Sequence, residues 1–394
     1  MLDDLDPLME KYGIDALLTH GNAFENPDIY WLTGFLSPDD IIYLKNKGDE
    51  PIVATAFLTV ERVKKESSIK KTHDLSEIHL QILKENKKIR DNQDRDFEDL
   101  LKKQFSGKLL GVPDVFPASF LVMIQKMGYE IKVVRDLVQE ARATKSSKEI
   151  KTIKKVGKAT TEGISHVVEV VKDCEIGANK VLMHEGEPFT VGKAKRILDH
   201  FLIDKDTESA EDMILAVGKR AFDWHYLGAA NDKFKSEVPI ILDVFPRLKK
   251  DRYIADVTRT FVKGSVSKRV QKMFEAVEDA AIRTADALTD GAIIDDVNMA
   301  CFKTLQKHGF DSRRLNPDAK DGMTHGLGHG IGLEVHELPS MYNRQDLFTE
   351  GHVMAIEPGV YLEGIGGVRI ENDYAVTKGK AARLTTGIED VLYI

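Results

Sequence analysis

The sequence has 394 residues, of which 42% are hydrophobic and 30% charged, and its formal net charge is -8. A chain of this length exceeds what one hydrophobic core usually serves, so two domains are expected. The acidic balance argues against a nucleic-acid partner, and no apolar stretch approaches the roughly eighteen residues that a membrane span requires. Because Cys174 and Cys301 are the only cysteines, neither a disulfide framework nor a thiolate metal site is expected.

The N-terminal segment, Met1 to Tyr12, carries four acidic side chains. An export signal would instead carry a basic segment followed by an apolar one. The sequence therefore predicts a cytoplasmic protein that does not associate with a membrane.

Residues 1–141 are predicted to form a smaller α/β domain, because short apolar runs alternate there with charged helical stretches. A helix is expected over Val60–Lys70. The lysines between Lys84 and Lys103 are interleaved with acidic residues, which is typical of a solvated helix face. The predicted strands are Asp15–Thr19, Ile41–Leu44, Ile52–Phe57 and Lys108–Val112.

A second domain is predicted over residues 146–394. Ser146 and Glu149 have the spacing of a capping box, which marks the start of a long helix. Turn signals at glycine then separate further helical stretches. The predicted helices are Lys148–Val171, Val191–Leu202, Lys268–Leu288 and Ile294–Lys307.

Four carboxylates in the second domain lie within apolar strands, two in each of two predicted hairpins. Asp243 and Asp256 belong to the first hairpin, and Glu357 and Glu371 belong to the second. A single buried carboxylate usually accepts a hydrogen bond from a backbone amide or pairs with an arginine, and Arg259 and Arg369 are available for this. Four neighbouring buried carboxylates repel one another, however, and together they indicate a pair of divalent cations.

Between the hairpins, the segment from His325 to Glu337 contains the histidines His325, His329 and His336 and is rich in glycine. Glycine lets the backbone curl and approach a site closely, so this segment can direct imidazoles at metals held by the carboxylates. Four carboxylates and one imidazole favour Mn²⁺ or Co²⁺, with Fe²⁺ or Zn²⁺ as alternatives.

Other catalytic motifs are incomplete. The glycines from Gly326 to Gly330 lack the third glycine of a dinucleotide fingerprint, because Ile331 stands in its place. The zincin pattern is absent after His336, and no nucleophile elbow surrounds Ser165.

The order Asp, Asp, His, Glu, Glu in these surroundings resembles the pita-bread metallopeptidases, the family of methionine aminopeptidase, aminopeptidase P and prolidase. The motif Asp28–Phe35 resembles part of an N-terminal domain that is present in prolidase and aminopeptidase P but absent from methionine aminopeptidase. The resemblance therefore implies an α+β protein with a pita-bread catalytic domain preceded by a creatinase/prolidase-like α/β domain. The motifs that carry it are Ala255–Thr260, Gly328–Gly332 with His336 and Glu337, Ile356–Gly359 with Tyr361, Gly367–Glu371, and Asp28–Phe35.

The resemblance also implies a role for each site residue. Asp243 would bind one metal, Asp256 and Glu371 would bridge both, and His329 and Glu357 would bind the other. A hydroxide between the metals would attack the scissile carbonyl, with Glu357 as proton shuttle. The implied catalytic side chains are His225, His325, His336 and Glu357, and the implied substrate-binding side chains are His225, His336 and Arg369.

The activity implied is hydrolysis of the bond before proline, either in Xaa-Pro dipeptides or at the N-terminus of longer chains, by a homodimer. One departure concerns the first hairpin, where Phe245 replaces the family's usual glycine and the loop before Asp256 is longer by an even number of residues. Because strand side chains alternate, both carboxylates should still point the same way. The alternatives are a general aminopeptidase, a non-catalytic peptide- or protein-binding relative of the same fold, and a metal-free hydrolase of a small amide.

Overall fold

The computed structural model describes residues 5–394 of the chain. Asp3 and Asp4, which contribute to the expected absence of an export signal, lie outside these residues. The chain divides into two compact units, Met1–Arg142 and Ala143–Ile394.

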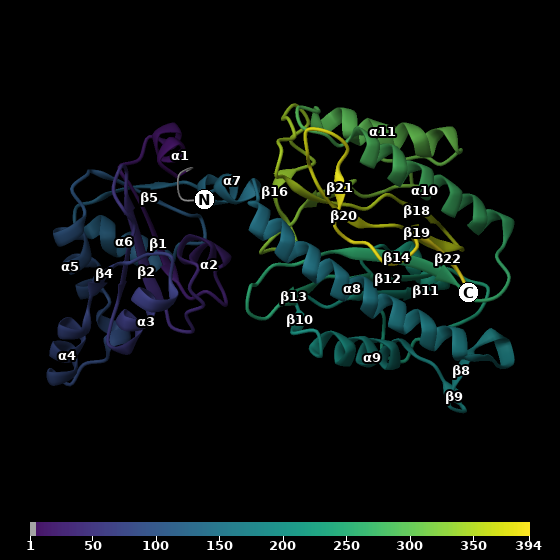
Figure 1. Cartoon of the computed structure of the whole chain (residues 1–394), viewed down its shortest axis with the longest axis horizontal. Coiled ribbons are helices and arrows are strands. Elements are labelled where there is room, and N and C mark those ends of the chain that lie inside the picture. Colours follow the sequence, from purple (N-terminus) through teal and green to yellow (C-terminus); the bar gives the residue numbers. More distant parts are fainter. Residues whose placement is uncertain (1–4) are drawn as a thin grey trace. The chain divides into compact units, whose positions relative to one another are not determined.

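The first unit is built around a mixed six-stranded sheet with the order β4-β3-β2-β1-β5-β6 (Figure 1). The four predicted strands are confirmed and correspond to β1, β2, β3 and β5. The edge strands β4 and β6 were not predicted, because they are short and largely exposed and so lack an alternation of apolar residues. The strands are β1 (Ala16–Gly21), β2 (Ile41–Asn46), β3 (Ile52–Thr55), β4 (Lys71–Asp74), β5 (Leu109–Val112) and β6 (Glu130–Val133).

Helices cover both faces of this sheet, and the alternation along β1 explains why two apolar clusters form. Leu17 points into one cluster and Leu18 into the other. The helix predicted over residues 60–70 is confirmed but begins at Leu58 and ends at Glu66, because the backbone becomes extended at Ser67. The helices are α1 (Leu5–Tyr12), α2 (Pro27–Thr33), α3 (Leu58–Glu66), α4 (Ser76–Lys84), α5 (Asp94–Gln104), α6 (Ala118–Lys126) and α7 (Leu137–Ala143).

The four helices predicted in the second unit are confirmed, each to within two residues at both ends. The first begins at the predicted capping box, in which Ser146 N–H donates to Glu149 Oε2 at 2.7 Å and the Ser146 side chain accepts from Glu149 N–H. The helices are α8 (Ser147–Asp173), α9 (Val191–Ile203), α10 (Lys268–Ala287) and α11 (Ile294–Lys307).

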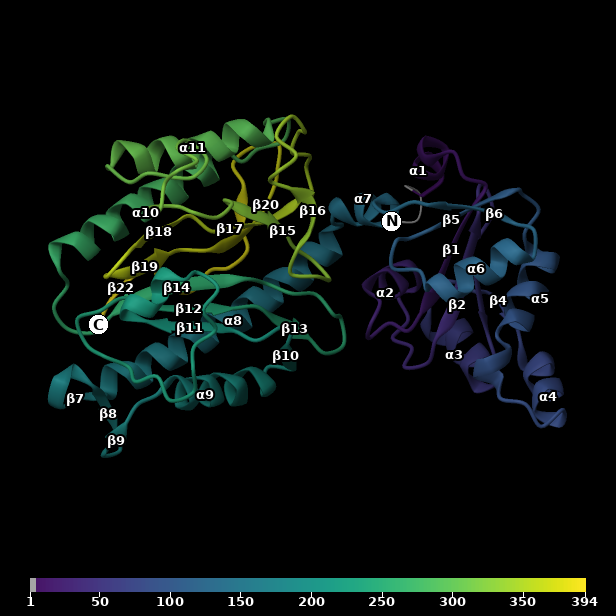
Figure 2. The same cartoon turned by 180° about the vertical axis from the view of Figure 1, so that it is seen from behind.

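The second unit has two halves, each with a sheet on the inside and a helix pair on the outside (Figures 1 and 2). In one half, α8 and α9 pack on the sheet β11-β12-β14-β22. In the other half, α10 and α11 pack on strands β17 and β20 of a second sheet. The first sheet comprises β11 (Ile214–Val217), β12 (Ile240–Val244), β14 (Val257–Val262) and β22 (Val391–Tyr393). The second comprises β16 (Glu337–Ser340), β15 (Gly328–Gly330), β17 (Val353–Ile356), β20 (Asn372–Ala375) and β21 (Ala382–Arg383).

The first predicted hairpin is confirmed, because β12 and β14 pair antiparallel with Asp243 opposite Thr258. The longer loop between them contains β13 (Pro246–Leu248), which pairs with β10 (Thr207–Ser209).

The second predicted hairpin is divided into two antiparallel pairs. β17 pairs with β20, whereas β18 (Gly359–Leu362) pairs with β19 (Gly366–Arg369). Pro358 accounts for the interruption on one side, since proline cannot donate to a ladder. Glu357 and Glu371 lie at the two breaks, where the backbone is irregular and a carboxylate can leave the plane of the sheet.

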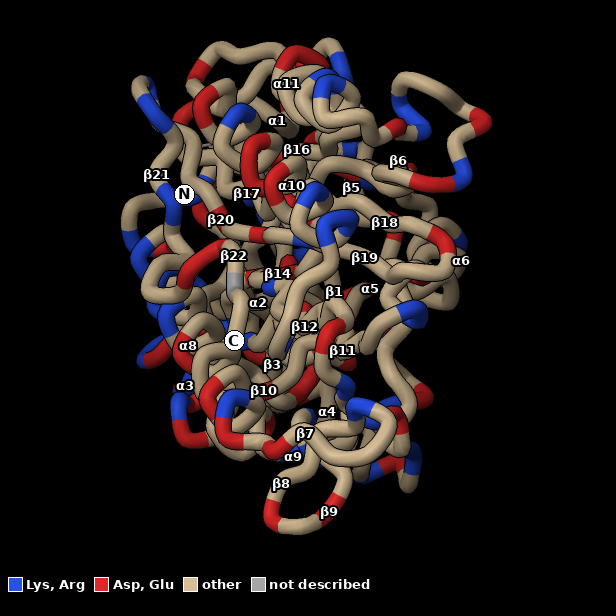
Figure 3. The backbone as a smooth tube through the Cα atoms, turned by 90° about the vertical axis from the view of Figure 1, so that its right-hand side faces the viewer, with Lys and Arg blue, Asp and Glu red and all other residues tan. Residues whose placement is uncertain are grey.

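No helix within residues 5–394 is long and apolar enough to cross a membrane. Figure 3 shows acidic and basic residues interspersed along the backbone.

Candidate metal centre

Both halves of the second unit contribute carboxylates to one site. Asp243 lies on β12, and Asp256 immediately precedes β14. From the other half, His329 lies on β15, a strand enclosed by its two neighbours. The backbones approach so closely there that a Cβ on Gly328 would lie 2.0 Å from the Ala355 carbonyl oxygen. Glycine at this position therefore lets the histidine strand enter the sheet.

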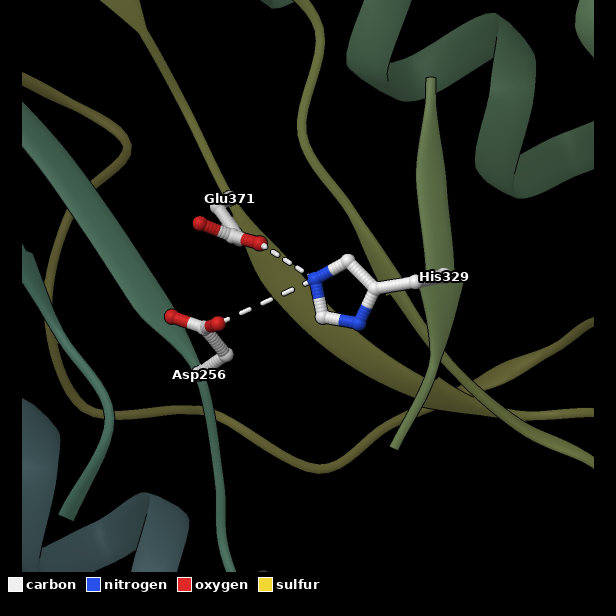
Figure 4. A group of neighbouring side chains, drawn as sticks. All are labelled: Asp256, His329 and Glu371. Atoms are coloured by element: carbon white, nitrogen blue, oxygen red, sulfur yellow. Dashed lines mark ion pairs between the residues drawn. The ribbon is translucent and has the colours of Figure 1, made fainter. Parts of the chain in front are cut away.

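Three of the predicted ligands meet closely. One atom from each of Asp256, His329 and Glu371 lies within 4.8 Å of the other two. His329 Nε2 is 3.8 Å from a carboxylate oxygen of each acidic partner (Figure 4). Asp243 and Glu357 stand outside this tight group but line the same cavity.

The hydrogen bonding of His329 fixes which ring nitrogen faces the carboxylates. Nδ1 lies 3.1 Å from the Gly330 carbonyl oxygen, which can only accept, so Nδ1 carries the proton. Burial, and next the nearby His336, lower the pKa of His329 to about 3. The ring is therefore neutral, and the lone pair of Nε2 points at two carboxylates. A cation between these groups would convert a repulsion into coordination.

The buried carboxylates of the site have raised pKa values and oxygen atoms without hydrogen-bond partners. Burial, and then Glu371 and Asp243, hold the pKa of Asp256 well above its ordinary value. Burial, and then Asp243 and Glu357, do the same for Glu371. Asp243 Oδ1 and Asp256 Oδ1 are buried and have no hydrogen-bond partner among residues 5–394. Orphaned carboxylate oxygens beside a neutral imidazole fit divalent cations well, because such a donor set needs positive charge at its centre.

A cavity of about 770 Å³ lies over this centre, and all nine predicted site residues line it. His225 and His336 are exposed within it, whereas the His325 side chain is only 5% exposed. The His329 and His336 rings lie 4.3 Å apart between centroids, so the glycine-rich segment curls as predicted. Apolar and aromatic side chains complete the wall, among them Phe245 at the position that departs from the family pattern.

A hydrogen-bonded chain connects His325 to the carboxylates. His325 Nδ1 lies 2.6 Å from the Gly326 carbonyl oxygen and so donates to it, which leaves Nε2 to accept from the Tyr361 hydroxyl at 3.1 Å. Arg369 donates to the Tyr361 hydroxyl at 2.9 Å and to Asp243 Oδ2 at 2.6 Å. Arg369 thus pairs with a predicted metal ligand, as one of the two arginines that the sequence made available to the buried carboxylates, whereas the resemblance implied a contact with substrate.

Several side chains of the site were not identified from the sequence. The Thr258 hydroxyl donates to Glu371 Oε2 at 2.6 Å, and Asp373 Oδ2 accepts from the Asp256 amide at 3.0 Å. Each lies two positions after a predicted ligand, and this period-two spacing could have revealed them. The cavity-lining arginines Arg313, Arg314 and Arg344 lie in loops, where no periodic signal exists.

Comparison with known proteins identifies the family. The model of metallopeptidase family M24 matches residues 151–378. This chain belongs to metallopeptidase family M24. The Creatinase/Prolidase N-terminal domain matches residues 1–144. The predicted fold, a pita-bread catalytic domain after a smaller N-terminal α/β domain, is confirmed, and family membership implies divalent metal.

Individual relatives of this M24 chain extend over nearly its whole length. The Xaa-Pro dipeptidase of Pyrococcus horikoshii is 30% identical over 387 residues, covering 96% of this chain and 94% of the relative. The solved prolidase from the same organism superposes with a TM-score of 0.78 at 25% identity, covering 99% of both chains. An X-Pro aminopeptidase from Thermotoga maritima superposes with a TM-score of 0.75 at 22% identity, covering 100% of this chain and 99% of its own. The fold is therefore common to proteins named for either activity.

Proposed function

We propose that this M24 peptidase is a Xaa-Pro dipeptidase that depends on two divalent metals, Mn²⁺ or Co²⁺ by preference. The observation that carries the proposal is the convergence of four carboxylates and one neutral imidazole on a single cavity. We assign Asp243 to one metal, His329 and Glu357 to the other, and Asp256 and Glu371 to both. Fe²⁺ and Zn²⁺ are the alternatives for the same donors.

When bound, such metals supply a hydroxide nucleophile at neutral pH and polarise the scissile carbonyl. Glu357 carries the proton released from the water to the nitrogen of the leaving proline. Burial is the largest influence on this carboxyl and, with Asp243, raises its pKa to about 7. In the metal-free protein this carboxyl therefore holds a proton more readily than an exposed glutamate does.

The histidines act on the substrate. His336 is exposed in the cavity beside the His329 ring, where an imidazole can stabilise charge that develops on the carbonyl oxygen. His325 donates Nδ1–H to Gly326 and accepts from Tyr361, so its ring is held in place at the cavity wall. His225 is exposed next to Trp224, with ring centroids 3.7 Å apart, and we assign it to the substrate pocket.

The charges of the cavity wall favour a dipeptide over a longer chain. Arg313, Arg314 and Arg344 line it from the loops that follow α11, whereas Glu211 and Asp212 line it from the segment before β11, in the other half of the unit. A free dipeptide carries an ammonium group and a carboxylate group close together. The acidic side chains of the wall complement the ammonium group, and the arginines complement the carboxylate.

Two of these arginines have partners of their own. Arg314 pairs with Asp295 at 2.9 Å, and Arg313 Nε donates to the Ala319 carbonyl at 3.4 Å. The Arg344 side chain is exposed and forms neither an ion pair nor a hydrogen bond within residues 5–394, so its guanidinium is the one we assign to the substrate carboxylate.

The direct test is hydrolysis of Ala-Pro, Ala-Pro-Ala and Ala-Ala by the metal-loaded protein, before and after chelation. We expect cleavage of Ala-Pro, slower cleavage of Ala-Pro-Ala, no cleavage of Ala-Ala, and loss of activity on chelation. Equal rates on Ala-Pro and Ala-Ala would indicate a general aminopeptidase. Absence of bound metal and of hydrolysis would indicate a non-catalytic binding protein.

A further inference from the structure

The turn Ile331–His336 connects His329, the predicted metal ligand, to His336, the predicted substrate contact. The two rings lie 4.3 Å apart between centroids although seven positions separate them. His336 can act at the site only while this turn holds its shape. The turn is short of regular support, since β15 ends at Gly330 and β16 begins at Glu337.

Glu337 supports the turn from within. Its side chain is 1% exposed, and Oε1 accepts a hydrogen bond from the Leu333 amide at 2.7 Å. Lys145 Nζ lies 3.9 Å from the other carboxylate oxygen, and the lysine side chain is equally buried. A carboxylate with a charge partner and a fixed amide is constrained in both position and orientation.

Gly332 shows how closely the carboxylate is packed against the turn. A Cβ at this position would lie 1.9 Å from Glu337 Oε1 and 3.1 Å from Lys145 Cε. The Gly332 carbonyl also accepts from the Ile254 amide at 2.8 Å, two residues before Asp256. The turn is therefore clamped between the Glu337–Lys145 pair and the segment that carries a predicted metal ligand.

We propose that Glu337 is a positioning residue for His336, acting through the Leu333 amide and anchored by Lys145. The proposal rests on the function proposed above, because it assumes that His336 acts on the substrate. Glu337 itself does not line the cavity, so we assign it an effect on the site only through the turn.

The first test is kinetic, on Ala-Pro with the metal-loaded protein. Glu337→Ala should lower kcat by roughly 10- to 100-fold while metal content and KM change little. Because Glu337 acts through His336, the double variant His336→Ala with Glu337→Ala should be no slower than His336→Ala alone. Losses that multiply in the double variant, or loss of metal from Glu337→Ala, would overturn the proposal.

A conservative double variant distinguishes a positioning role of Glu337 from a role in folding. Glu337→Gln combined with Lys145→Met keeps an oxygen that accepts from the Leu333 amide and removes both buried charges together. We expect this double variant to recover most of the kcat that Glu337→Ala loses. The exposed carboxylate Glu363 is the matched control, and Glu363→Ala should leave kcat unchanged. No recovery in the conservative pair, with folding intact by circular dichroism, would contradict the role of the amide contact.

The second test needs no activity and so separates the clamp from the proposed function. Amide hydrogen exchange in the metal-free protein should accelerate about tenfold or more at Leu333 in Glu337→Ala, because its acceptor is gone. Exchange in the middle of α10 should be unchanged. If Leu333 exchanged equally in both proteins, the clamp would be refuted, whatever peptide the protein hydrolyses. If Leu333 responded but the wild type did not cleave Ala-Pro, the proposed function would fail, and so would the role of Glu337 in it.

Discussion

Arg369 Nη2 lies 2.6 Å from Asp243 Oδ2, and both side chains are buried in the wall of the cavity. The same guanidinium reaches the Tyr361 hydroxyl and the Thr258 hydroxyl, which in turn donates to Glu371. Arg369 thus offsets part of the negative charge of the four carboxylates. Metal would offset the remainder.

Removing this charge should destabilise the metal-free protein. We expect Arg369→Met to lower the free energy of unfolding by about 3–5 kcal/mol, because it leaves Asp243 buried without its partner. Urea denaturation in the presence of a chelator measures this difference. Arg283→Met is the matched control, since Arg283 pairs with Asp279 at an exposed surface, and it should have little effect. Equal effects of the two substitutions would contradict the charge-balancing role.

Neutralising the predicted bridging carboxylates should release metal. Asp256→Asn and Glu371→Gln each remove a charge from the centre of the ligand group, so on the proposed two-metal assignment both metals would lose a ligand. We expect metal content by elemental analysis and activity to fall together in each variant. Glu350→Gln, at an exposed carboxylate outside the cavity, should retain both. Full activity of Asp256→Asn after chelation would refute the two-metal assignment.

The two histidines joined by the turn should separate under the same measurement. His329→Ala should lose metal and activity together, since its lone pair faces the carboxylates. His336→Ala should retain metal but lose on the order of 10²-fold or more in kcat and kcat/KM, because in the proposed function its imidazole acts on charge that develops in the transition state. Loss of metal from His336→Ala and its retention in His329→Ala would reverse the two roles.

Much of the fold followed from the sequence wherever a local signal existed. The capping box at Ser146 and the apolar periodicity placed α8 to α11 to within two residues. The alternation around Asp243 gave the β12–β14 pairing. The edge strands β4 and β6 carried no comparable pattern. The break at Pro358 could have been anticipated, because proline cannot donate to a ladder, but the division of the second hairpin between two sheets depends on tertiary contacts.

The site was less fully predictable than the fold. Carboxylates and histidines in apolar surroundings marked the cavity, because their burial requires compensation that the sequence makes visible. The pairing of Arg369 with Asp243 joins residues 126 positions apart, and no local rule gives its register. The arginines of the cavity wall lie in loops, which only the folded chain brings to the site. The predicted homodimer, the cytoplasmic location and the boundaries 1–141 and 146–394 stay predictions.

The buried imidazole of His352 should make stability depend on pH. Burial, and next Lys145, lower the pKa of His352 to about 4 from an ordinary value of 6.5, and Nδ1 accepts from the Thr349 amide at 3.1 Å. Between these pH values the unfolded chain binds a proton that the folded chain does not. The contribution of His352 to the free energy of unfolding is therefore fully present above about pH 6.5. It is lost as the pH drops toward 4, by on the order of 1–3 kcal/mol.

Asparagine at this position keeps an acceptor but cannot titrate in this range. His352→Asn should therefore flatten the loss of stability between pH 6.5 and 4, as measured by urea denaturation across that range. His200→Asn, at an exposed histidine on α9, should not change it. An unaltered pH dependence in His352→Asn would show that the imidazole does not contribute.

Arg344, in the cavity wall, should decide between dipeptidase and aminopeptidase activity. If Arg344 binds the substrate carboxylate, Arg344→Met should lower kcat/KM for Ala-Pro by roughly 10- to 100-fold, the value of one charge-assisted hydrogen bond. Ala-Pro-amide has the same scissile bond but no terminal charge, so its kcat/KM should already be low in the wild type and change little in the variant. Lys307→Met, which removes an exposed cation outside the cavity, should affect neither substrate.

Arg344→Met removes the protein partner of this interaction and Ala-Pro-amide removes the substrate partner, so their effects should not add. Equal losses on both substrates would mean that the guanidinium supports the cavity wall without reading the carboxylate. Wild-type cleavage of the amide at the rate of Ala-Pro would favour the aminopeptidase alternative, with the metal centre unchanged.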